Sequence, residues 1–244
     1  MEQKSPRHFY RKQARFHQAV DCVIFGFEGG ELKLLLIKRR FQPARGQWSL
    51  MGGFLRRDEN LEEGARRVLE ELTGLYNVYL EQLHTYSRVH RDPGERVIST
   101  AYYALIGIQD SDLQRTFAHN AHWVNIGSMP QLIFDHGTMA EAALRELRRK
   151  CRYYPVGFEL LPAKFTMTQL QNLYEAIFGQ RFDSANFRRK MISTGLLQRL
   201  EEKERGTSKR GAHYYRFDQE AYERLRSTGF LPDLPWRSES HTQI

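Results

Sequence analysis

The segment "GGFLRRDENLEEGARRVLEELTGL", residues 52–75, combines a glycine pair, an acid-rich run and a closing glycine. Five of its apolar residues share one stripe at helical spacing: Leu61, Ala65, Val68, Leu69 and Leu72. This stripe predicts an amphipathic helix over about 61–73, and Gly74 stands where a C′ glycine ends a helix. The segment therefore looks like a catalytic element, with aliphatic residues where some carboxylates would be expected.

The sequence around this segment predicts a mixed α and β domain. Apolar, β-branched runs at 19–27 and 32–40 are joined by a glycine turn, which is typical of a β-hairpin. The other expected elements are strands at about 47–54, 77–87, 97–107 and 121–126 and a helix over about 137–150.

The C-terminal part of the chain follows a different pattern. It predicts helices over about 166–179 and 183–195, then two strands within 196–217 that are joined by a basic tip. Between Arg181 and Arg216 there are ten Lys or Arg residues and four acids, in a chain of net charge +8. Two helices followed by a basic hairpin is the order of a winged helix-turn-helix. A helical domain with a solvated hairpin that binds nothing is the alternative.

The second of these helices would be the recognition helix. Its N-terminal residues would meet base edges, and its amide dipoles favour phosphate. Arginine can contact guanine bidentately, Asn186 could contact adenine, and the cations of the hairpin suit phosphate or the minor groove. The predicted DNA-binding residues are Ser184, Asn186, Arg188, Arg189, Lys190, Lys203, Arg205, Lys209 and Arg210.

The opening segment resembles the Nudix hydrolase motif. The matching positions, in one ungapped register, are Gly53, Glu59, Arg67, Leu69, Glu71, Gly74 and Leu75. The resemblance implies an α/β/α sandwich with a mixed sheet. In that family three carboxylates on one helix face hold Mg²⁺, but two of them are Val68 and Leu72 here. Since Glu71 alone should hold Mg²⁺ poorly, we expect a degenerate Nudix box without catalytic residues, metal, cofactor or enzymatic activity.

The chain as a whole is similar to the Nudix-related transcriptional regulators, which join a Nudix-like effector domain to a C-terminal winged helix. The resemblance covers about residues 18–220 and rests on "WSLMGGF", "RDPGERVISTAYYAL" and "NFRRKMISTGLL…RGAHYYRF". One branch of that family senses ADP-ribose and regulates NAD metabolism, and another responds to arabinose. The lost acids favour the arabinose branch. The expected function is therefore repression of sugar utilisation with L-arabinose or another pentose as effector, and ADP-ribose is the alternative.

The positions of Nudix folds also suggest ligand-binding residues. A sugar needs an apolar face and convergent polar groups. The predicted ligand-binding residues are Phe41, Trp48, Met51, Gly52, Arg88, Asp92, Glu95 and Arg96. As alternatives, Trp48 is a core residue and "RDPGER" is a surface turn with an ion pair.

These patterns divide the chain into four expected segments. They are a basic N-terminal segment (1–17), a Nudix-like effector domain (18–154), a winged helix-turn-helix domain (155–230) and a C-terminal tail (231–244). Cys22 and Cys151 fit buried thiols in a reducing compartment. The lack of a signal peptide or an apolar run of about 18 residues predicts a cytoplasmic protein that does not contact membranes.

Operator symmetry predicts a homodimer on double-stranded DNA. In this hypothesis the ligand changes the spacing of two winged helices and lowers operator affinity. Two other classes of protein stay open: an active Nudix hydrolase of ADP-ribose-like substrates and a non-catalytic RNA-binding Nudix protein.

Overall fold

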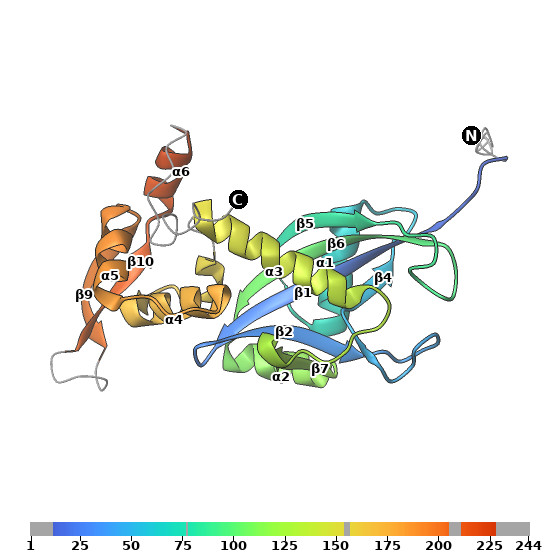
Figure 1. Ribbon diagram of the computed structural model, residues 1–244, viewed down its shortest axis with the longest axis horizontal. Helices are drawn as coiled ribbons and strands as arrows, with labels where there is room; N and C mark the ends of the chain where they lie inside the picture. Colours follow the sequence, from blue (N-terminus) through green and yellow to red (C-terminus); the bar gives the residue numbers. More distant parts are fainter. Residues whose placement is uncertain (1–11, 77, 154–156, 205–210, 228–244) are drawn as a thin grey trace, which may run out of the picture.

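The structure, a computed structural model, describes residues 12–76, 78–153, 157–204 and 211–227. A mixed sheet with helices on both faces occupies one end of an elongated molecule, and a smaller domain with its own sheet occupies the other (Figure 1). The expected fold class, a mixed α/β sandwich followed by a winged helix, is confirmed.

The larger sheet is built around a parallel pair of central strands, β1 and β6, and its main path runs β3-β2-β1-β6-β5. In addition, β4 pairs with β1 and β7 pairs with β2. The strands are β1 (His17–Glu28), β2 (Glu31–Lys38), β3 (Trp48–Ser49), β4 (Met51–Phe54), β5 (Tyr79–Tyr86), β6 (Val97–Gly107) and β7 (Ala121–Asn125). The helices of this end are α1 (Leu61–Thr73), α2 (Asp110–Ala118), the 3-10 helix η1 (Ile126–Ser128) and α3 (His136–Tyr153).

Alternation along β1 gives the sheet two apolar faces. Val20, Cys22 and Ile24 pack on one face, in a cluster that includes apolar residues of α1. Val23 and Phe25 pack on the other, in a larger cluster with residues of α3 and of the C-terminal helices. The expected buried state of both cysteines is confirmed.

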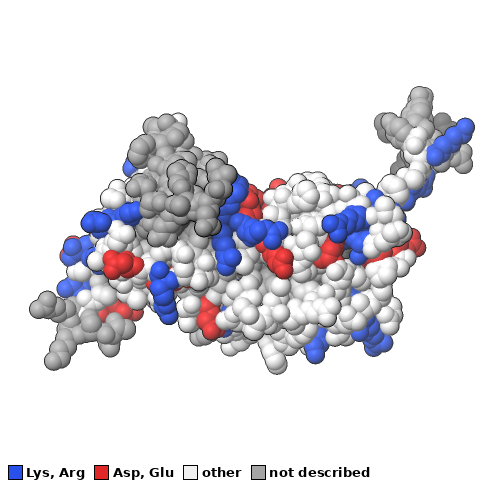
Figure 2. All heavy atoms as spheres, in the orientation of Figure 1, with Lys and Arg blue, Asp and Glu red and all other residues white. Residues whose placement is uncertain are grey.

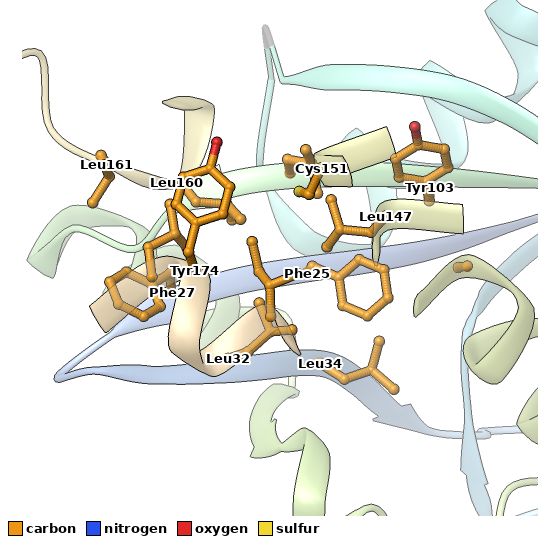
Figure 3. Close-up of a cluster of buried hydrophobic side chains, with 14 of the residues drawn as sticks. Phe25, Phe27, Leu32, Leu34, Tyr103, Leu147, Cys151, Leu160, Leu161 and Tyr174 are labelled. Carbon is orange, nitrogen blue, oxygen red and sulfur yellow. The ribbon is translucent and has the colours of Figure 1, made fainter. Parts of the chain in front are cut away.

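The smaller domain is a winged helix that shares this larger core. Its elements are η2 (Phe158–Leu160), β8 (Phe165–Thr166), α4 (Met167–Phe178), α5 (Ser184–Ser193), β9 (Leu197–Glu204), β10 (Ala212–Phe217) and α6 (Gln219–Ser227), with strand order β8-β10-β9. Figure 3 shows Tyr174 of α4 in one group of side chains with Phe25 of β1, Leu34 of β2 and Leu147 of α3. The two domains are therefore packed on each other through apolar contacts as well as joined by the chain.

Most of the expected elements are present, and α1 has the predicted bounds. The structure adds α2 and α6, which the sequence patterns did not predict. In α2 the inward residues include Asp112 and Thr116, both buried, so that this helix lacks a clear apolar stripe. The predicted domain boundary between 154 and 155, the C-terminal tail (231–244) and most of the N-terminal segment (1–17) lie outside the described residues.

Candidate effector cleft and DNA-binding face

Two residues of the Nudix-like segment fasten the loop before α1 to the helix. Nε and Nη2 of Arg67 donate to the two carboxylate oxygens of Glu59 at 2.8 and 2.6 Å, and Nη2 also donates to the carbonyl oxygen of Phe54 at 3.1 Å. The backbone N–H of Arg56 donates to Glu59 at 2.7 Å. These hydrogen bonds lower the pKa of Glu59 to about 2, and those from Arg67 contribute most. Glu59 and Arg67 therefore act as a structural pair.

The glycines of this segment are required by close packing. A Cβ at Gly52 would collide with Oδ1 of Asp21, and one at Gly53 would lie 2.7 Å from Cγ2 of Val68. Gly74 ends α1 with φ of 71°, in the left-handed region. The segment thus keeps the backbone of a Nudix loop and helix.

The face of α1 that would hold a metal has a different chemistry. Val68 is 2% exposed and packs in the core beside β1, and Leu72 is half-buried at the edge of the cleft. Glu71 is exposed and pairs with Arg56 at 3.0 Å and with Arg67 at 3.1 Å. Within the described residues, no three His, Cys, Asp or Glu residues come together as metal ligands. This donor set does not fit Mg²⁺, which prefers several oxygen ligands.

A cavity of about 360 Å³ lies beside this helix, and we call it the Nudix cleft. Its lining includes Asp21 of β1, the loop residues Arg39 and Phe41, Phe134, and His136 at the start of α3. Its volume falls in the range of small-molecule sites, about 300–1,000 Å³.

The structure brings three of the eight predicted ligand residues into the lining: Phe41, Gly52 and Asp92. Met51 instead lies in the core, because alternation in β4 turns it inward. Trp48 packs against the larger core, with Nζ of Lys38 over its ring at 5.1 Å.

The other three predicted ligand residues lie outside the lining. Glu95 pairs with His17 at 3.4 Å, and Arg96 donates to the carbonyl oxygen of Arg88 at 3.1 Å. The guanidinium of Arg96 also stands over the ring of Phe16 at 5.2 Å. This part of "RDPGER" is thus a surface turn, as the alternative interpretation had it, and its charged side chains contact neighbouring residues outside the cleft.

The base of the cleft holds a buried polar network that the sequence analysis missed. Nε and Nη2 of Arg91 donate to the carboxylate of Asp135 at 2.9 and 2.7 Å, and Nη2 lies 3.6 Å from Oδ2 of Asp21. Ser99 donates to the same Asp21 oxygen at 2.6 Å. The available signal was Asp21 itself, a charged residue inside an apolar strand.

His136 completes this network as a neutral side chain. The backbone N–H of Leu50 donates to Nδ1 of His136 at 3.1 Å, which leaves the ring proton on Nε2. Nε2 lies 3.6 Å from Oδ1 of Asp21. Burial lowers the pKa of His136, so the ring is uncharged at neutral pH. The hydrogen-bond donors and acceptors at the base of the cleft are therefore fixed by their contacts with one another.

Arg39 gives the cleft an unsatisfied cationic donor. Its guanidinium carbon lies 4.1 Å from the ring centroid of Phe41 and 5.4 Å from that of Phe134. Its Nε is buried and has no hydrogen-bond partner within the described residues. Burial lowers the pKa of Arg39, which means that the charged form is poorly solvated. An anion or a strong acceptor in the cleft would satisfy this group.

The winged helix places most of the predicted DNA-binding residues on one helix. Phe187 and Met191 of α5 are fully buried, and the helix is capped at Asp183, whose side chain accepts from the N–H of Asn186 at 2.8 Å. The predicted residues on α5 are Ser184, Asn186, Arg188, Arg189 and Lys190. Figure 2 shows Lys and Arg side chains around this end of the molecule, with acidic side chains among them.

The remaining predicted DNA contacts belong to the wing. Lys203 is exposed on β9, while Arg205, Lys209 and Arg210 lie outside the described residues. Oδ1 of Asn186 accepts from Nη2 of Arg189 at 2.9 Å, which uses one of its two lone pairs and leaves the other available to adenine.

Helix α3 connects the cleft with the winged helix. Its first residue, His136, and the preceding Asp135 belong to the buried network of the cleft. Near its other end, Nε of Arg148 donates to the carbonyl oxygen of Ile177 in α4 at 2.6 Å. Helix α3 thus contacts both the buried network of the cleft and the winged helix.

A Nudix-type cleft that lacks two of the three metal carboxylates, on one core with a winged helix, defines a ligand-responsive DNA-binding regulator. Residues 15–137 match the NUDIX domain family, and residues 157–217 match the "NrtR DNA-binding winged helix domain". The chain belongs to the NrtR-like family of regulators.

Individual relatives agree with this assignment. The "ADPR responsive transcriptional repressor NtrR" of Acinetobacter baylyi is 36% identical over 84% of this chain and 83% of its own length. The structure of Shewanella oneidensis NrtR in complex with a 27mer DNA is similar with a TM-score of 0.74 and 30% identity, over 84% of this chain and 95% of that one. The NUDIX domain of the same NrtR in complex with ADP ribose has a TM-score of 0.51 and 31% identity, over 58% and 94%.

These relatives favour the alternative branch over the expected one. Two of them are named for ADP-ribose, and the arabinose-responsive branch finds no support among the comparisons. In the described residues, no helix is long and apolar enough to cross a membrane.

Proposed function

We propose that the Nudix cleft binds ADP-ribose and that this ligand regulates DNA binding by the winged helix. The buried Nε of Arg39, which has no hydrogen-bond partner within the described residues, is the observation that carries the proposal, together with the ADP-ribose named for the relatives. ADP-ribose offers an anionic diphosphate, which can neutralise Arg39, and a planar base, which can stack on Phe41 or Phe134. L-arabinose is neutral and has no planar base, so its oxygens could accept a hydrogen bond from Arg39 without neutralising its charge.

We infer that the cleft binds this ligand without hydrolysing it. Nudix hydrolysis needs charge neutralisation on the diphosphate by metal ions, and the α1 face offers Glu71 between Val68 and Leu72. Glu71 is also engaged by Arg56 and Arg67, so it is poorly placed to bind a cation. The role that remains for the cleft is recognition.

The regulation that we propose acts through α3. A ligand that contacts Arg39 lies beside Phe134 and His136, and these residues lead directly into α3. Differential binding of a few kcal/mol between two arrangements of α3 and α4 is enough to change operator affinity. We expect release of DNA on ligand binding, as in a repressor. We also expect a homodimer, because paired recognition helices match a palindromic operator.

Thermal unfolding with added ligands tests the choice of effector. ADP-ribose is expected to raise the Tm of the wild type by mass action, and L-arabinose is expected to leave it unchanged. Arg39→Met should weaken ADP-ribose binding at least tenfold, as for a lost charged hydrogen bond. Arg57→Met, at an exposed arginine outside the lining, is the matched control. Stabilisation by L-arabinose and not by ADP-ribose would restore the arabinose branch.

Two further measurements test regulation and catalysis. ADP-ribose is expected to lower the fluorescence anisotropy of a labelled duplex, selected by the protein from a random-sequence library, by releasing it. With Mg²⁺ and ADP-ribose the wild type is expected to form no AMP, and Glu71→Gln should leave the ligand-induced rise in Tm intact. AMP formation that disappears in Glu71→Gln would identify a hydrolase instead.

A further inference from the structure

The hydroxyl group of a core tyrosine faces the recognition helix. Tyr215, on β10, is 3% exposed, and its ring belongs to the core that the two domains share. Its hydroxyl accepts a hydrogen bond from Nη2 of Arg188 at 3.1 Å. A buried tyrosine hydroxyl needs a hydrogen-bond partner, and Arg188 of α5 provides one. A hydrogen bond from Arg188 to Tyr215 thus connects the recognition helix with the core.

The backbone of Arg188 is fixed as well as its guanidinium. The adjacent Phe187 is fully buried, and its ring stacks on Phe182 with a centroid distance of 5.8 Å. An arginine that becomes ordered only on binding loses much rotamer freedom at that moment. The hydrogen bond to Tyr215 restricts the Arg188 side chain before DNA arrives, so less rotamer entropy remains to be lost on binding.

The next cation on the helix is held differently. Nη2 of Arg189 donates to Oδ1 of Asn186 at 2.9 Å, a contact between two side chains on the exposed side of the same helix. Such a surface contact exchanges with water and does not connect Arg189 to the core. Arg188 and Arg189, although adjacent, therefore differ in how firmly their guanidinium groups are positioned.

We propose that Arg188 contacts a base edge of the operator and that Tyr215 is the positioning residue that orients it. The proposal rests on DNA binding by the winged helix. Hydrogen bonding to Tyr215 uses one of the five N–H donors of the guanidinium, and the others can donate two parallel bonds to O6 and N7 of guanine. Arg188 thus specifies a G·C pair, whereas Arg189 and Lys190 contribute charge toward phosphates.

The test uses the full-length protein and duplexes selected from a random-sequence library by the wild type. Binding of the selected consensus, and of a series with single base-pair changes, is measured by fluorescence anisotropy at several salt concentrations. The variants are Arg188→Lys, which keeps the charge, and Tyr215→Phe, which removes only the hydroxyl group. Tyr214→Phe is the matched control, because Tyr214 lies on the same strand and its ring stands under Nζ of Lys164 at 5.1 Å.

Arg188→Lys is expected to lose about tenfold discrimination at one G·C pair, the value of a bidentate contact. Tyr215→Phe is expected to lose at least threefold discrimination at that same pair. The salt dependence of both should equal that of the wild type, since phosphate contacts are unchanged. Tyr214→Phe should retain the discrimination of the wild type at every position.

Three results would overturn the proposal. The first is an equal weakening of binding to all duplexes in Tyr215→Phe, which would indicate a purely structural role. The second is a loss of discrimination at different base pairs in the two variants. If Tyr215→Phe loses its cooperative unfolding transition, the Arg188→Lys series alone tests the contact of Arg188 with a base. The third result is that Arg188→Lys changes discrimination at no base pair, which would refute that contact. A wild type that selects no consensus would refute DNA recognition itself, which separates that failure from failure of this inference.

Discussion

Helices α1 and α5 are built alike and used differently. Each begins at a capping side chain, Asn60 in α1 and Asp183 in α5, and each buries one apolar stripe. The cations of α1 are neutralised within the protein, as the bond from Arg67 to Glu59 shows. In contrast, α5 contains three adjacent cations and no acidic residue. The two helices therefore differ in whether acids pair with their cations. The cations of α1 are paired within the protein, beside the cleft, and those of α5 are available to an anionic partner.

The same difference extends to the surroundings of the two helices. At the base of the cleft, Asp21 and Arg91 are buried and satisfy each other together with Asp135. On the winged helix, charged side chains are exposed to solvent around α5 and β9. Charges of the first kind depend on one another, because removal of one member leaves another buried and uncompensated. Charges of the second kind contribute little to stability.

The largest effect is expected from removing the cation of the buried network. Arg91→Met leaves Asp21 and Asp135 without their partner, and should lower the free energy of unfolding by about 3–5 kcal/mol. Urea denaturation measures this loss. Arg189→Met, the matched change on α5, should alter stability by less than about 0.5 kcal/mol while weakening DNA binding. Equal loss of stability in the two variants would contradict the distinction between the two kinds of charge.

The sequence predicted local features well for a physical reason. The register of α1 and the order of the winged helix follow from periodicity and glycine positions within short windows. The network of the cleft could not be predicted in this way, because Asp21, Arg91 and His136 are far apart in the chain and meet only through the pairing of β1 with its neighbours and the start of α3. The prediction of the effector branch rested on the loss of two acids, at Val68 and Leu72. That loss bears on metal binding and carries no information about which ligand the cleft binds.

The next effect concerns the pair that fastens the Nudix loop to α1. Because the pKa of Glu59 is lowered to about 2, below its unfolded value of about 4.3, its ionised form stabilises the native state. That contribution is present above about pH 4.3 and is lost as the pH falls toward 2. The difference in unfolding free energy between the wild type and Glu59→Gln should therefore narrow through this range.

Urea denaturation at pH 7, 4 and 3 follows this difference. Glu62→Gln serves as the control, since Glu62 makes an exposed pair with Arg66 on the same helix. A difference for Glu59→Gln that stays constant over this pH range would show that the pair with Arg67 does not stabilise the fold through the charge of Glu59.

The smallest effects on stability are expected from the N-caps of α1 and α5. They test whether the Nudix-like domain and the winged helix unfold together. Asn60 accepts from the N–H of Glu63 at 3.0 Å, and Asp183 accepts from that of Asn186 at 2.8 Å. Replacing either cap by alanine should cost about 1 kcal/mol. Since Phe25 of the sheet and Phe187 of α5 belong to one core, both variants should lower the same cooperative transition in calorimetry. Two transitions, each sensitive to one variant, would mean that the domains unfold independently. An effect of ligand binding on the winged helix would then have to pass through the contacts of α3 alone.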